Sequence, residues 1–141
     1  MNYEDTLKVG AKVYDVGYVE VGGKYYEQND DGSVNFEAGD NDLRGGYDED
    51  GNPIEATDII YLEFGKCTIL PNSAANAVTL VDGSTYVYSY EVYSLLNTKK
   101  YKMLPKEGDK VWITKKDGTV DKVMEVKGFV TYKKRYLRLW L

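Results

Sequence analysis

The feature that most constrains the fold is the alternation of apolar and polar residues over short stretches that end in glycine-containing turns. The stretch AVTLVDGSTYVYSYEVYSL has Asp82-Gly83 near its centre, and Tyr86, Tyr88 and Tyr90 share one side of its second arm. Successive side chains of a strand point to opposite faces of a sheet, and Asp-Gly is a favoured two-residue hairpin turn. The stretch therefore predicts a β-hairpin.

The same pattern recurs along the chain about every 8 to 12 residues, as is typical of sandwiches and barrels. A strand is predicted over residues 12–21, followed by a turn at Gly22-Gly23 into KYYEQ. Another is predicted over residues 59–70, either broken or bulged at Gly65. A meander follows from GDKVWITKKDG, with its turn at Asp117-Gly118, to the end of the chain. Residues 1–141 are thus predicted to form one all-β domain, a small antiparallel β-barrel or sandwich of about seven strands.

The final segment, YKKRYLRLWL, also fits a strand. Leu137, Leu139 and Leu141 fall on one face at period two, whereas Arg138 and Trp140 fall on the other. We expect the leucines to close the core at the end of the chain. Arg138 and Trp140 are then predicted to face a neighbouring subunit.

A long acidic loop is predicted over residues 29–58, which are rich in Gly, Asp and Asn. A structureless stretch of this length is uncommon inside a compact domain and usually has a function or is disordered. Calcium binding is an alternative, but Arg44 occupies the position of the third ligand in an EF-hand alignment of DNDLRGG. We therefore favour an exposed acidic arm over a metal site.

Several chemistries are disfavoured by composition. The chain has no histidine, so triads and zinc sites that need histidine are excluded, and Cys67 is the single cysteine and is predicted to be buried. We find no phosphate-binding or dinucleotide motif, and expect no enzyme activity, catalytic residue, cofactor or metal. No stretch is apolar enough to span a membrane and the N-terminus lacks a signal pattern, so we expect a soluble protein made in the cytoplasm.

Charge is divided unevenly along the chain. Residues 1–98 carry 5 basic and 18 acidic side chains, a net charge of −13, whereas residues 99–141 carry 13 basic and 5 acidic, a net charge of +8. One interpretation of the division is two solvated surfaces that neutralise each other, and another is two poles suited to head-to-tail contact between copies of the chain or to contact with a charged partner. A third interpretation is direct DNA binding by the basic part, which also contains Tyr101, Trp112, Tyr132, Tyr136 and Trp140.

From Gly65 onward the order of motifs becomes recognisable. The segments GKCTILPNSAANAVTLVDGSTYVYSYEVY, PKEGDKVWITKKDGTVDKVMEVKGF and YLRLWL resemble the small β-barrel head-closure proteins of tailed bacteriophages, also called stoppers or head-tail connectors. The resemblance covers residues 65–141. It implies a non-enzymatic virion protein that forms a ring of subunits in the neck, joins the portal or adaptor to the tail and helps to retain packaged DNA.

The resemblance also implies the partners: copies of the chain in a ring, portal or adaptor protein, tail proteins and nearby packaged DNA bound without sequence specificity, with no membrane. Localisation would be the head-tail neck of the virion, after synthesis in the host cytoplasm. Two alternatives stay open, an acidic phage-encoded inhibitor that mimics nucleic acid, of the anti-restriction or anti-CRISPR type, and a generic β-barrel binding module.

The interface residues predicted from charge and pattern form two groups. The acidic arm consists of Asp40, Asp42, Asp48, Glu49 and Asp50. The basic pole and closing strand consist of Lys99, Lys100, Lys102, Lys133, Lys134, Arg135, Arg138 and Trp140.

Overall fold

The fold is known from a computed structural model, which describes residues 2–14, 17–37, 47, 50–53, 55–80, 82–97 and 100–141. Antiparallel strands dominate these residues, as predicted, together with one short 3-10 helix, η2 (Lys100–Met103). In chain order the strands are β1 (Asp5–Tyr14), β2 (Tyr18–Val21), β3 (Lys24–Gln28), β4 (Val34–Asn35), β5 (Ala56–Pro71), β6 (Ala77–Thr79), β7 (Thr85–Val87), β8 (Tyr90–Leu95), β9 (Lys110–Thr114), β10 (Asp121–Glu125), β11 (Gly128–Tyr132) and β12 (Tyr136–Trp140).

The described residues thus form twelve strands, where the sequence predicted about seven. The difference arises partly because turns divide segments that look continuous in sequence. The predicted strand over residues 12–21 is the end of β1 and all of β2, separated by a turn at Gly17, whose φ is 85°. The arm after Asp82-Gly83 is divided into β7 and β8 at Ser89, whose N–H donates to the Leu141 carbonyl at 2.6 Å.

The predicted hairpin turns are confirmed. Gly22-Gly23 joins β2 to β3, the segment containing Asp82-Gly83 joins β6 to β7, and the segment containing Asp117-Gly118 joins β9 to β10. In the last two turns the aspartate accepts a hydrogen bond from the backbone N–H two residues later, as turn aspartates commonly do.

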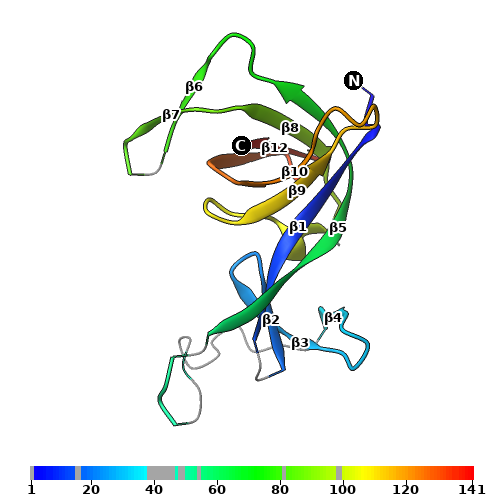
Figure 1. Cartoon of the computed structure of the whole chain (residues 1–141), viewed down its shortest axis with the longest axis vertical. Helices are drawn as coiled ribbons and strands as arrows, with labels where there is room; N and C mark the ends of the chain where they lie inside the picture. The colour runs from blue at the N-terminus through cyan, green and yellow to red at the C-terminus, as the bar shows by residue number, and fades with distance from the viewer. Residues whose placement is uncertain are drawn as a thin grey trace.

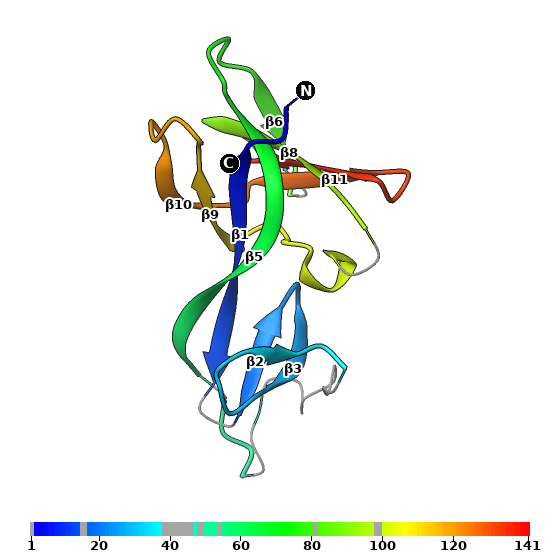
Figure 2. The same cartoon turned by 90° about the vertical axis from the view of Figure 1, so that its right-hand side faces the viewer.

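Ten strands form one branched sheet in the order β11-β12-β8-β5-β1-β2-β3-β4, with β9 attached to β1 and β10 attached to β9. Strand β1 takes two partners on one side, because its first half pairs with β9 and its last three residues pair with β2. Strand β5 has a register shift opposite Leu7 and Lys8, next to Gly65 at φ 139°, which confirms the predicted bulge. Figures 1 and 2 show the result: β1 and β5 run the length of the molecule and link an upper lobe to a lower lobe.

The sheet does not close into the barrel that was one of the two predicted architectures. Within the described residues, β10 pairs with β9 and β11 pairs with β12, but β10 and β11 do not pair with each other. The two residues between them turn the chain away: Val126 is fully buried in the core, and the Lys127 N–H donates to the Trp140 carbonyl at 2.8 Å.

Two hydrophobic clusters form the cores of the molecule, one in the upper lobe and one in the lower lobe. The upper one contains the fully buried Leu137, Leu139 and Leu141, as predicted for the closing strand, and the fully buried Cys67. Each such leucine contributes about 2 kcal/mol through its burial. The lower cluster is smaller and is built on Ala11, Val19, Val21 and Tyr26.

The predicted loop over residues 29–58 is not confirmed as one structureless stretch. Strand β4 lies within it and pairs with β3, Tyr47 forms an isolated bridge with Pro53, and β5 already begins at Ala56. These short pairings were hidden by a composition that contains few β-formers. Residues 38–46, 48–49 and 54 of this segment lie outside the described residues.

Candidate interaction surface

A network of polar and aromatic side chains lies on the outward side of strands β8 and β12. Its hub is Glu91, which accepts hydrogen bonds from Arg138 Nη2 at 2.9 Å, from the Tyr93 hydroxyl at 2.8 Å and from the Tyr88 hydroxyl. Because Leu137 and Leu139 point into the core, the period of the strand requires Arg138 to face outward. Sequence reasoning placed Arg138 and Trp140 on this side, but not Glu91.

The guanidinium of Arg138 lies between two aromatic rings. Its Cζ is 4.6 Å from the Trp140 ring centroid and 5.4 Å from that of Tyr93, both within the range of cation–π attraction. The Arg138 and Glu91 side chains are only 28% and 15% exposed. Burial raises the pKa of Glu91, but the hydrogen bonds from Tyr88, Arg138 and Tyr93 outweigh burial and hold that pKa below its ordinary value. The carboxylate therefore stays charged, and Arg138 is held in one orientation.

Large apolar side chains surround this network and remain exposed. Leu70, Leu95, Tyr132 and Tyr136 are 40%, 44%, 45% and 46% exposed. Pairing of Leu95 with Tyr136, and of Tyr136 with Tyr132, places three of them in a row across the sheet. We call this surface the outer sheet face: Leu70, Glu91, Tyr93, Leu95, Tyr132, Tyr136, Arg138 and Trp140. Fixed aromatic rings around a held arginine are typical of the centre of a protein interface.

The turn between β11 and β12 carries three cations at one end of this face. Lys133, Lys134 and Arg135 are all exposed, and the Arg135 N–H closes the turn by donating to the Tyr132 carbonyl at 2.9 Å. The hairpin projects from the upper lobe in Figure 2, where it is orange to red. We call these three residues the basic turn.

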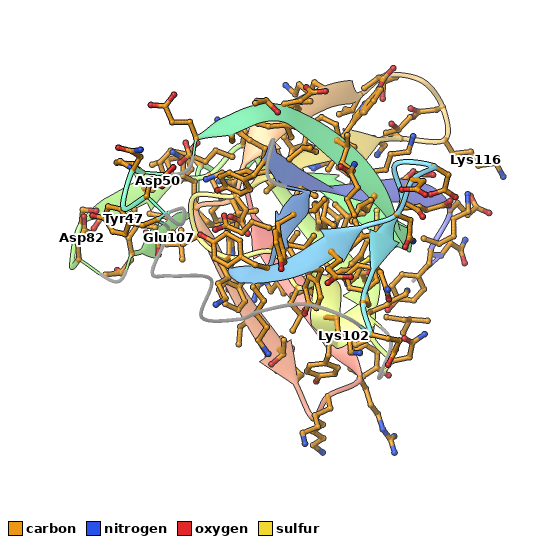
Figure 3. The ribbon with its side chains drawn as sticks, turned by 90° about the horizontal axis from the view of Figure 1, so that it is seen from below. Tyr47, Asp50, Asp82, Lys102, Glu107 and Lys116 are labelled. Carbon is orange, nitrogen blue, oxygen red and sulfur yellow. The ribbon has the colours of Figure 1, made fainter. Side chains whose placement is uncertain are left out.

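The other predicted basic residues are dispersed. Lys100 Nζ lies 5.2 Å from the Phe64 ring and donates to the Leu95 carbonyl at 3.2 Å, so it packs beside β8. Lys102, labelled in Figure 3, instead donates to the Phe36 carbonyl at 3.1 Å and pairs with Glu37 at 3.4 Å. Lys102 thus contacts the lower lobe and not the basic turn. Lys99 lies outside the described residues.

Most of the predicted acidic arm also lies outside the described residues, namely Asp40, Asp42, Asp48 and Glu49. Asp50 is described and exposed, and Figure 3 labels it on the lower lobe, on the other side of the view from Lys102. Further acids lie near it, most of them within the acidic loop predicted over residues 29–58, whereas Glu20 and Glu27 lie in β2 and β3. Residues 17–37, 50–53 and 55–58 are hereafter the acidic lobe. Lys24 is their one cation, and their acids are Glu20, Glu27, Asp30, Asp31, Glu37, Asp50, Glu55 and Asp58.

The aromatic residues considered for DNA binding do not share one surface. Trp112 lies on β9, where its ring meets that of Tyr61 at 5.6 Å and its Nε1 donates to Asp121 at 2.5 Å. Tyr101 lies in η2 and packs against the upper cluster. Tyr132, Tyr136 and Trp140 are the three that reach the outer sheet face.

Among the described residues, no three acidic or cysteine side chains are grouped so that they could hold a metal ion. The described part of the chain contains no helix with the length and apolar character needed to cross a membrane. Comparison with protein families, curated proteins and solved structures finds no match for the chain.

Proposed function

We propose that the protein is a structural, non-enzymatic subunit of the head-tail connector of a tailed phage. In this role it forms a ring in the virion neck, joins the portal or adaptor to the tail and helps to retain packaged DNA. The motifs over residues 65–141 motivate this family. The observation that carries a role in assembly is the outer sheet face, where exposed apolar side chains surround an arginine held by Glu91, Tyr93 and Trp140.

Such a surface suits a partner protein for two physical reasons. The aromatic and leucine side chains offer apolar area whose burial is favourable, at about 25 cal/mol per Å². The held guanidinium has already lost its rotamer freedom, so binding does not have to restrict it further. A ring also requires contact between two different surfaces of each subunit, and the basic turn and the acidic lobe differ in charge.

The test uses phage heads assembled without this chain, to which purified protein is added before gradient sedimentation. We expect the wild-type protein to sediment with the heads and to restore DNA retention. Leu95→Glu places a charge on the outer sheet face and should abolish both. Val123→Glu on β10 is the matched control, because Val123 is 45% exposed and Leu95 is 44% exposed.

Two outcomes would count against the proposal. One is a wild-type chain that stays at the top of the gradient and fails to restore DNA retention. The other is a stoichiometric complex with a host nuclease that charge reversal of Asp50 breaks, which would favour the inhibitor that mimics nucleic acid.

A further inference from the structure

The basic turn has a backbone conformation that lysine does not favour. Lys133 has φ 49° and Lys134 has φ 57°, so two consecutive residues with a Cβ adopt the left-handed conformation. Positive φ at both central positions is the mark of a type I′ hairpin turn, which strongly prefers Asn-Gly. Each left-handed residue with a Cβ carries a conformational cost that Asn or Gly largely avoids.

Within the described residues, no ion pair of the two lysine side chains offsets that conformational cost. Both are exposed, and no ion pair joins Lys133, Lys134 or Arg135 to a carboxylate in the part of the chain that the structure describes. Three adjacent cations also repel one another. Residues with an unfavourable backbone conformation cluster at functional sites, which motivates a function for these exposed charges.

We propose that the basic turn of one copy docks on the acidic lobe of a second copy, and this inference rests on the ring of the proposed function. A second copy is the expected partner because the basic turn and the acidic lobe have complementary charges. The acidic lobe carries eight carboxylates against Lys24 among its own described residues, while Lys12 and Lys102 from neighbouring elements pair with Glu20 at 3.9 Å and with Glu37 at 3.4 Å. The side chain of Glu37 is still 88% exposed. Acidic and basic surfaces that meet across an interface guide association and fix its orientation.

The sheet topology makes this contact head-to-tail. Strands β11 and β4 end the longest run of the branched sheet, which has a further end at β10, and the basic turn follows β11 while Asp30, Asp31 and Glu37 flank β4. In the described residues β11 pairs with β12 alone and β4 pairs with β3 alone. The basic turn and the acidic lobe therefore lie at two different ends of the sheet, so one contact leaves the other surface of each copy free for the next copy.

Tyr132 and Tyr136 extend the same contact with apolar area. They are a cross-strand pair at the base of the turn, on the outer sheet face, and nearly half of each side chain is exposed. A partner that covers the cations also covers these rings. Tyrosine suits such a position because its ring packs while its hydroxyl stays hydrated.

The test pairs two variants that each retain one half of the contact. Lys133→Asn/Lys134→Gly removes both lysine charges and fits the turn, whereas Glu27→Gln/Asp30→Asn/Asp31→Asn removes three of the eight carboxylates of the lobe, those in β3 and between β3 and β4. Asn at position 31 keeps an oxygen for the Ser33 N–H, which Asp31 accepts at 2.9 Å. Mixed together, the two variants have one competent contact and form a heterodimer without further growth. NMR amide shifts of each labelled variant are followed during titration to millimolar concentration.

We expect shifts at β11–β12 of the lobe variant and at residues 27–37 of the turn variant, and neither variant alone should show them. Salt screens exposed charges, so affinity should fall at least about tenfold between about 0.05 M and 0.5 M salt. Shifts elsewhere, or none at millimolar protein, would overturn the contact. If the wild-type chain sediments with phage heads but the two variants show no contact, the contact alone is refuted. If the two variants bind each other but the wild-type chain does not sediment with heads, the connector role is refuted.

Discussion

Replacing the two left-handed lysines of the basic turn, Lys133→Asn/Lys134→Gly, should stabilise the folded chain although it removes two residues of a proposed interface. A left-handed residue with a Cβ costs about 1 to 2 kcal/mol, Asn relieves part of this at φ 49°, and Gly relieves it at φ 57°. Glycine returns about 0.5 to 1 kcal/mol through its greater freedom in the unfolded chain. The free energy of unfolding should therefore rise by about 1 to 2 kcal/mol.

The assay is urea and thermal unfolding followed by circular dichroism at a concentration where the protein is monomeric. For a chain of this size the midpoint should rise by about 4 °C or more. Lys133→Gln/Lys134→Gln is the matched control, because it removes the same charges but keeps the unfavourable φ. A gain in the control equal to that of Asn-Gly would assign the effect to charge repulsion. No gain in either variant would refute the argument from strain.

Three further results follow from the buried groups. Asp5 accepts hydrogen bonds from the N–H groups of Ile69 and Lys116, both at 2.9 Å. Asp5→Ala should therefore lower the free energy of unfolding, measured by urea titration, by about 3 kcal/mol or more. A loss below about 1 kcal/mol would contradict this role. Burial raises the pKa of the Cys67 thiol to about 12. A thiol reagent at mildly alkaline pH should therefore label Cys67 only after the protein unfolds. Rapid labelling of the native protein would contradict this expectation. Leu139 is fully buried, so Leu139→Ala should cost about 2 to 5 kcal/mol, and a neutral substitution would show that the closing strand does not belong to the core.

Local pattern in the sequence predicted what depends on local physics. The alternation of Leu137, Leu139 and Leu141 identified the buried face of the closing strand, and the Asp-Gly pairs identified the hairpin turns, because both depend on neighbouring residues alone. The bulge at Gly65 was also predictable, since a glycine inside an apolar run commonly marks one.

Long-range pairing was not predictable in the same way. The open edge between β10 and β11 depends on the burial of Val126, and the division of the partners of β1 depends on strands far away in the chain. Charge alone grouped Lys102 with the basic pole, but the fold places it against Glu37 in the lower lobe. The network around Glu91 was missed because Arg138, the partner that pairs with its charge, comes from a strand that is distant in sequence.

The most direct test of the connector role is the number of copies of this chain in purified virions, measured by quantitative mass spectrometry against the portal protein. A ring in the neck requires a fixed whole-number ratio to the portal ring, unchanged from one preparation to another. We expect such a ratio for the wild-type chain and its loss in virions made with the Leu95→Glu chain. Absence of the wild-type chain from infectious virions would contradict it.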